Sequence, residues 1–343
     1  MNIHQNTLYV FTQGTYLHRD HQTVKVESEG KTVTTIPIHH LDMIAAFGRV
    51  MVSPGLMELC QESGVGVTFL SESGRLMARL DAPRSGNVLL RREQFRRADN
   101  PDACLALAKS FVAGKLHNCR NALVRAARES RVPDDSIVLN QTASRLGEQI
   151  RMVGRSTTMD EVRGREGESA RSYFAALPRM IRQQRDQFPM NGRTRRPPLD
   201  AVNALLSFVY ALVTADCVAG LTAAGLDPDV GFLHADRPGK PSLALDLTEE
   251  FRGLIADRLV LSLINRQQVR PDQFVQREGG AVEMSAEARK TLVQAYIMRK
   301  REELTHPLLN KSVRVGQLWF IQAKLLARSL RGDADIYLPC IPR

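Results

Sequence analysis

The sequence has few cysteines and few aromatic residues. Its five cysteines are scattered, with no two closer than fifteen positions, which excludes a CxxC zinc site and a disulfide framework. Aromatic residues make up 6% of the chain, with a single tryptophan, and no aromatic RNA-recognition motif is present. The chain also lacks the GxxxxGK and GxGxxG motifs, so neither of these nucleotide-binding loops is expected.

Long apolar segments are also scarce. The most apolar stretch, residues 204–215, is interrupted by Asp216 after about twelve residues, well short of the ~20 needed to cross a bilayer. The first ten residues have neither the basic start nor the apolar core of a signal peptide. These absences predict a soluble protein of the reducing cytoplasm with no membrane contact.

The charge is strongly unbalanced. The 47 Lys and Arg exceed the 37 Asp and Glu, giving a net charge of +10, and 43% hydrophobic residues indicate a folded protein. Residues 84–131 hold eleven basic and four acidic residues, and residues 179–196 hold six and one. We call these the two basic windows, and they favour a polyanion such as DNA as partner. A solvated basic face without a ligand is the alternative.

Two kinds of pattern divide the chain. Short segments of alternating apolar residues, with one helix after the Ser53-Pro54 cap, predict a small β-rich domain over residues 1–82. A linker is expected at 83–88, and helical spacing dominates residues 89–343, with a hairpin around Gly279-Gly280. The predicted class is α+β, with a small β-rich domain before a larger all-α catalytic domain. The tail 337–343 fits a flexible end or docking on a partner.

Two positions stand out as candidate site residues. Glu166 shares a helix face with Ala170, Tyr173 and Leu177, so it should point inward, where a carboxylate needs a cation, metal or donor. A structural pairing with a nearby arginine, Arg163 or Arg171, is the alternative. His234 ends an apolar run and precedes a polar loop, a place where side chains often carry function, although a lone histidine there is commonly structural.

The helix predicted after Pro241-Ser242 carries three carboxylates on one side. Asp246, Glu249 and Glu250 are spaced i, i+3, i+4, and such a face is normally solvated. With an imidazole added, these oxygens would suit Mg²⁺ or Mn²⁺.

Four segments together resemble one known family. They are REGESARSYF at 165–174, NALLSFVY at 203–210, GFLH at 231–234 and PSLALDLTEEFR at 241–252. In this order they closely resemble the CRISPR-associated integrase and endonuclease family that inserts new spacers, of the subtype I-C kind. The resemblance extends over nearly the whole chain, from the β-rich start to the closing segment 322–327.

The resemblance implies a set of functional residues. Glu166, His234 and Glu249 match the family's catalytic metal ligands, for Mg²⁺ or Mn²⁺, and Asp246 matches a supporting or alternative ligand. Lys240, Arg252 and Arg171 would contact DNA. Glu168 stands where the family commonly has a small apolar residue, which places a second carboxylate near Glu166.

The resemblance also implies an activity and partners. Family members join a DNA 3′-hydroxyl to a phosphodiester at the CRISPR repeat, in the prokaryotic cytoplasm. They work as homodimers through their β-rich domains, and two dimers bracket a small ferredoxin-like partner protein in a heterohexamer. Two other interpretations remain: a structure-specific repair endonuclease and a non-catalytic basic DNA-binding scaffold.

Overall fold

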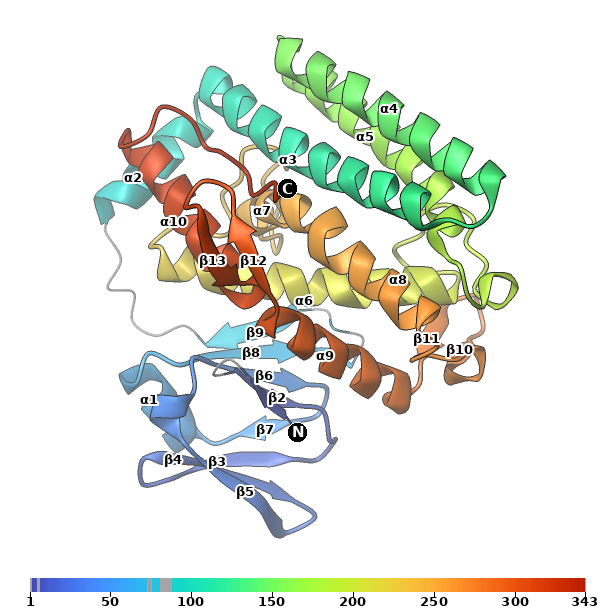
Figure 1. Cartoon of the computed structure of the whole chain (residues 1–343). Helices are drawn as coiled ribbons and strands as arrows, with labels where there is room; N and C mark the ends of the chain where they lie inside the picture. The colour runs from blue at the N-terminus through green and yellow to red at the C-terminus, as the bar shows by residue number, and fades with distance from the viewer. Residues whose placement is uncertain (1, 5–6, 73, 75, 81–87, 343) are drawn as a thin grey trace. The chain divides into compact units, whose positions relative to one another are not determined.

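The computed structural model describes residues 2–4, 7–72, 74, 76–80 and 88–342, and its contacts divide the chain into two compact units, Met1–Ser85 and Gly86–Arg343. The first unit is rich in strands and the second is mostly helical (Figure 1), so the predicted α+β class is confirmed. Of the linker expected at 83–88, residues 83–87 lie outside the described residues, and Val88 is the first residue of a helix.

Two sheets make up the first unit. One has the order β1-β2-β6-β8-β9, and the other has the order β5-β4-β3-β7. Leu17, Ile44 and Leu56 belong to one buried core built from both sheets and the helix α1. The elements are β1 (Asn2–His4), β2 (Thr7–Val10), β3 (Tyr16–Asp20), β4 (Thr23–Ser28), β5 (Lys31–Pro37), η1 (Ile38–His40), β6 (Met43–Phe47), β7 (Met51–Val52), α1 (Pro54–Glu62), β8 (Gly66–Leu70) and β9 (Leu76–Leu80).

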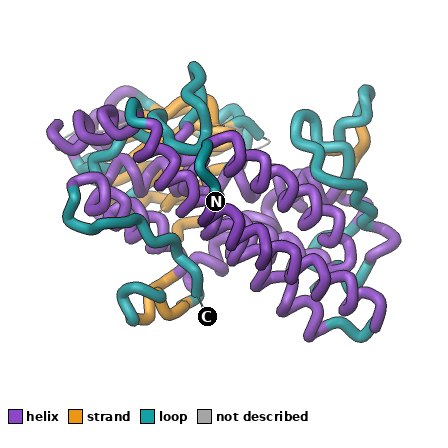
Figure 2. The backbone as a smooth tube through the Cα atoms, turned by 90° about the horizontal axis from the view of Figure 1, so that it is seen from above, coloured by secondary structure: helices purple, strands orange, loops and turns teal. Residues whose placement is uncertain are grey.

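Long helices lying beside one another form most of the second unit (Figure 2). They are α2 (Val88–Ala98), α3 (Pro101–Glu129), α4 (Pro133–Arg155), α5 (Met159–Ala176), α6 (Ala201–Ala223), α7 (Ser242–Phe251), α8 (Asp257–Asn265), α9 (Ala286–Arg301) and α10 (Leu318–Arg331). Shorter elements are η2 (Leu177–Met180), η3 (Arg185–Gln187), the π-helical turn η4 (Arg252–Ala256), η5 (Pro271–Gln273), β10 (Phe274–Gln276), β11 (Val282–Met284), β12 (Glu303–His306), β13 (Lys311–Arg314) and η6 (Val315–Gln317). The expected Gly-Gly hairpin is the β10–β11 pair, which confirms that prediction.

Side-chain caps fix where the long helices begin. The side chain of Asn100 accepts from two backbone N–H groups at the start of α3, and Thr158 and Asp200 cap α5 and α6 in the same way. Each cap satisfies donors that the helix itself leaves without a partner. The starting points of α3, α5 and α6 are therefore encoded locally.

The helix α6 continues past Asp216, the residue that interrupts the apolar stretch in the sequence. Lys300 and Tyr296 bind the carboxylate of Asp216 inside the core. By length and composition α6 could span a membrane, but 72% of its apolar window is buried in the described structure, as in a core helix.

The described part of the C-terminal tail packs against its own unit. Tyr337 is buried, and its hydroxyl donates to Glu250 of α7. The backbone N–H of Cys340 donates to the same carboxylate at 2.6 Å. Pro339 approaches α3 so closely that a Cβ on Gly114 would lie 2.5 Å from its ring. The tail therefore belongs to the core beside α3 and α7 (Figure 1).

Candidate metal centre

Helix α5 presents Glu166 toward α3. The side chain is partly buried, with 27% exposed, and Oε1 accepts from the ammonium of Lys115. This pairing replaces the one expected with Arg163 or Arg171, since Arg163 instead donates to the carbonyl of Leu233 at 2.9 Å. Glu166 thus points toward the interior of the unit, as its place on the apolar face predicted.

Helix α7 contributes Glu249, whose side chain is only 4% exposed. Its Oε2 lies 2.7 Å from Nζ of Lys115, and its Oε1 lies 2.9 Å from Nη2 of Arg252. Arg252 opens the π-helical turn η4, a geometry often found at functional sites, and its guanidinium lies 4.4 Å from the ring centre of Tyr210. Glu166 and Glu249, 83 positions apart, therefore meet at one ammonium group.

His234 lies beside Glu249, in the loop before α7. Its Nε2 is 3.9 Å from Oε1 of Glu249, and its Nδ1 is 2.7 Å from Oδ1 of Asp246. Asp246 is fully buried and also accepts the backbone N–H groups of Phe232, Leu233 and His234. Both of its oxygens are therefore occupied by hydrogen bonds to the histidine loop.

The three carboxylates of α7 are all buried, so the solvated face expected from the sequence is wrong. Asp246 faces the histidine loop, Glu249 faces Lys115 and Arg252, and Glu250 faces the tail. Burial raises the pKa of Glu250 to about 7, although its hydrogen bonds oppose the shift. Each carboxylate has polar partners from a different part of the chain, which makes its burial tolerable.

Opposite charges control ionisation at the centre. Burial raises the pKa of Glu249, but Arg252 and Lys115 outweigh it and hold that pKa well below the usual range. Burial lowers the pKa of Lys115, but Glu249 and Glu166 outweigh it and raise that pKa. Glu249 is thus available as an anion at neutral pH.

The types of donor atom at the centre fit a divalent metal, but the described side chains are too far apart to coordinate one in this structure. No group of three His, Cys, Asp or Glu side chains in the described part of the chain is in position to hold an ion. The ammonium of Lys115 lies between Glu166 and Glu249. Oε2 of Glu249 is buried, and the cation beside it in this structure is the ammonium of Lys115, at 2.7 Å. Two carboxylates and an imidazole are a suitable set for a hard divalent ion.

Sequence reasoning missed Lys115 and Gln94, and it missed the contact that Arg163 makes. Lys115 occupies the buried face of α3 with Phe111 and Cys119, so the spacing argument that identified Glu166 would also have identified it. Gln94 is fully buried and binds the backbone of Asp227 and Val230, which anchors the histidine loop to α2. No local sequence pattern predicts this contact. The same is true of the hydrogen bond from Arg163 to the carbonyl of Leu233 in the histidine loop.

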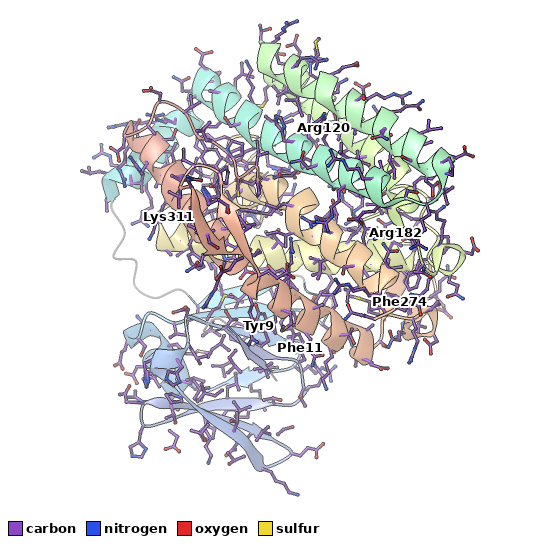
Figure 3. All side chains as sticks on the ribbon, viewed as in Figure 1. Tyr9, Phe11, Arg120, Arg182, Phe274 and Lys311 are labelled. Carbon is purple, nitrogen blue, oxygen red and sulfur yellow. The ribbon has the colours of Figure 1, made fainter. Side chains whose placement is uncertain are left out.

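Arginine-rich segments lie in the same unit as the centre. Glu129 joins the two basic windows, since its carboxylate binds Arg125 at 2.8 Å and Arg182 at 3.1 Å. Arg120 of α3 and Arg182, which follows η2, mark these windows in Figure 3.

The predicted DNA-contacting residues differ in their accessibility. Arg171 is exposed on α5, and Lys240 is half-buried before α7. Arg252 is buried beside Glu249. Their contacts with DNA stay predictions.

Two carboxylates and an imidazole beside arginine-rich helices are typical of metal-assisted enzymes of phosphodiester chemistry. A family model described as CRISPR associated protein Cas1 matches residues 8–297. Relatives named CRISPR-associated endonuclease Cas1 1 are 46% identical in Moorella thermoacetica and 48% identical in Chlorobaculum tepidum. Both alignments cover 100% of each chain. The chain belongs to the Cas1 family.

Solved structures share the fold. A Cas1 protein from Thermotoga maritima superposes with a TM-score of 0.80 at 22% identity, over 95% of this chain and 97% of the other. A casposase bound to its integration product gives 0.82 at 21% identity, over 98% and 93%. The family assignment makes the chain a CRISPR-associated endonuclease, as predicted. Nucleases of this family generally depend on a divalent metal.

Proposed function

We propose that the enzyme inserts short prespacer duplexes into a CRISPR array by attack of a DNA 3′-hydroxyl on a phosphodiester at the repeat. Glu166, His234 and Glu249 hold the metal, which is Mg²⁺ or Mn²⁺. The observation that supports this ligand set most strongly is convergence: Glu166 and Glu249 share Lys115, and His234 lies 3.9 Å from Glu249. Three positions spread over the sequence would meet at one point by chance only rarely.

Each nearby residue has a task in this reaction. Glu166, His234 and Glu249 would hold a divalent ion, which would supply positive charge to polarise the scissile phosphate and stabilise the attacking or leaving oxygen. Asp246 holds the imidazole of His234 so that Nε2 faces the carboxylate of Glu249. Arg252 keeps Glu249 ionised. The exchange replaces one phosphodiester with another, so it needs no nucleotide-binding loop.

Basic side chains would hold the DNA substrates. Lys240, Arg171 and Arg252 and the two basic windows are the proposed contacts with the phosphates of prespacer and repeat. Each neutralised phosphate releases counterions, so binding should weaken steeply as salt rises. The net charge of +10 supports this role.

The proposed assembly is a homodimer formed through the β-rich unit, with two dimers and a small ferredoxin-like partner in a heterohexamer. Among proteins of similar fold, one is a Cas6-RT-Cas1–Cas2 complex, matched with a TM-score of 0.80 at 23% identity over 99% of this chain and 36% of that one. We further propose subtype I-C, domains at residues 1–82 and 89–343, and a prokaryotic cytoplasmic location.

A strand-transfer assay tests the proposal. A labelled duplex with free 3′-hydroxyls is incubated with a supercoiled plasmid carrying the cognate repeat, the small partner protein, and either Mn²⁺ or EDTA. Glu166→Gln and His234→Ala should abolish metal-dependent joining while DNA binding survives. Glu168→Gln, which alters the exposed carboxylate two positions away, should join like the wild type.

Other outcomes favour the competing interpretations. Cutting without joining would indicate a structure-specific repair endonuclease. Binding with neither cutting nor joining under any metal would indicate a non-catalytic scaffold, in which the acidic residues form only a buried ion network.

A further inference from the structure

The ammonium of Lys115 lies where the two proposed carboxylate ligands come together. Its side chain is only 6% exposed, and it binds Oε1 of Glu166 and, at 2.7 Å, Oε2 of Glu249. Helix α3 packs against both α5 and α7, so the backbone holds the lysine between the helices that carry these carboxylates. The lysine is therefore a buried part of the centre, not a surface side chain.

Charge explains why a cation is needed there. Two partly or fully buried carboxylates repel each other and are costly to bury unless cations compensate them. Arg252, which packs on Tyr210, compensates the charge on Oε1 of Glu249. The charge on Oε2 of Glu249 and on Oε1 of Glu166 is compensated by Lys115. In this state the lysine supplies the charge that a divalent ion would otherwise supply.

The surroundings offer the lysine a second acceptor. Lys115 lines a pocket together with Ser169, Tyr210 and Asp257. The hydroxyl of Ser169 is buried and has no hydrogen-bond partner within the described residues. A lysine ammonium sits on a flexible four-carbon stem, so a change of acceptor would not require α3 to move.

We propose that Lys115 competes with the divalent metal for Glu166 and Glu249. Its ammonium neutralises the two carboxylates in the metal-free enzyme and must withdraw before they can close on an ion. The inference rests on the proposed function only in taking these two residues as ligands. It adds that the enzyme carries its own competitor, which lowers its affinity for the metal.

The proposal predicts that removing the lysine changes protein stability and metal affinity in opposite directions. Removing the ammonium with Lys115→Met should destabilise the metal-free protein, because two carboxylates lose their cation. The same change should make Mn²⁺ bind more tightly, by about tenfold or more, because the ion no longer displaces a cation. A lysine that merely supports the fold would give unchanged or weaker metal binding when removed.

Mn²⁺ titration of the full chain, followed by the electron paramagnetic resonance of the free ion, measures this directly. Lys115→Met and Lys115→Gln should lower the dissociation constant, whereas Lys115→Arg, which keeps a cation, should not. Lys300→Met is the matched control, since Lys300 is also buried and binds a carboxylate outside the centre. Its ammonium lies 3.0 Å from Asp216. Lys300→Met should lower the melting temperature but leave Mn²⁺ affinity unchanged.

Further comparisons separate this inference from the proposed function. Adding Glu166→Gln to Lys115→Met should remove the gain in affinity, which confirms where the ion binds. If Lys115→Gln, folded by circular dichroism, binds Mn²⁺ no more tightly than the wild type, the inference is overturned even when DNA joining is normal. If affinity rises while no variant or wild type joins DNA, the inference stands and the integrase proposal fails.

Discussion

The imidazole of His234 is held by Asp246 on one nitrogen and faces Glu249 with the other. Nδ1 lies 2.7 Å from Oδ1 of Asp246, and Nε2 lies 3.9 Å from Oε1 of Glu249. A carboxylate on one ring nitrogen fixes the tautomer and leaves the lone pair of the other nitrogen for a metal. Gly231 permits this geometry, because a Cβ there would lie 3.0 Å from Oδ2 of Asp246.

Asp246→Asn should weaken the centre without removing a ligand. An asparagine amide offers one acceptor oxygen where the carboxylate receives three backbone N–H groups and the imidazole. Loss of such a supporting carboxylate typically costs about 10–100-fold in metal affinity or activity. We expect losses of this size in Mn²⁺ binding and strand transfer. Asp236→Asn, on the same loop but exposed, is the control. Unchanged affinity would contradict the supporting role.

The tail should contribute stability through Glu250. Ending the chain after residue 335 removes the hydroxyl of Tyr337 and the N–H of Cys340, which leaves a buried carboxylate short of donors. A group left unsatisfied in this way costs about 3 kcal/mol or more. Urea unfolding should show this loss, and strand transfer should fall because Glu249 is the neighbouring residue. Ending the chain after Cys340 keeps both donors and should behave like the wild type, and equal losses in the two truncations would contradict this account.

Acid should weaken the link between α4 and the segment around η2 and η3. Asp135 is buried and accepts from Arg179 at 2.8 Å and Arg185 at 2.6 Å. Burial raises its pKa, but the two arginines outweigh it and hold that pKa below the ordinary value of 3.8. A carboxyl whose pKa is lowered on folding adds stability above its unfolded pKa, and this stability is lost as the pH falls through the folded pKa.

Asp135→Asn should therefore destabilise the protein by about 1–2 kcal/mol at pH 7, a modest value because both arginines are partly exposed. The difference in unfolding free energy between variant and wild type should shrink below about pH 3.8, because the unfolded wild type then takes up a proton on Asp135 and the folded protein loses that advantage. Asp134→Asn, at the exposed neighbouring position, should change stability little. Denaturant unfolding at pH 3 and pH 7 checks this, and an equal loss at both values would contradict the ion-pair explanation.

Local signals in the sequence predicted several elements correctly. Ser53 and Pro54 begin α1, where the serine hydroxyl accepts the N–H of Leu56 at 3.1 Å, and Gly279 lies in the turn of the β10–β11 hairpin. The inward direction of Glu166 followed from helical spacing. Strand β6 was missed because all five of its residues, Met43–Phe47, are buried, so it shows no alternation.

Long-range contacts set the rest of the centre. Asp246, Glu249 and Glu250 read as a solvated face because nothing nearby in the sequence pairs with them. In the structure Asp246 binds His234, 12 positions away, and Glu249 binds Lys115, 134 positions away. Glu250 binds Cys340 of the tail, 90 positions away. A helix face can be read from spacing, but what covers it depends on the fold.

The most direct test of the metal centre is a crystal structure of the protein grown with Mn²⁺, with anomalous scattering used to locate the ion. The account predicts one peak within about 2.5 Å of a carboxylate oxygen of Glu166, a carboxylate oxygen of Glu249 and Nε2 of His234. Asp246 should remain bound to Nδ1 of His234, outside the coordination. An ion held by Asp246 without Glu166 or His234, or no ion at this position in protein that joins DNA, would contradict the account.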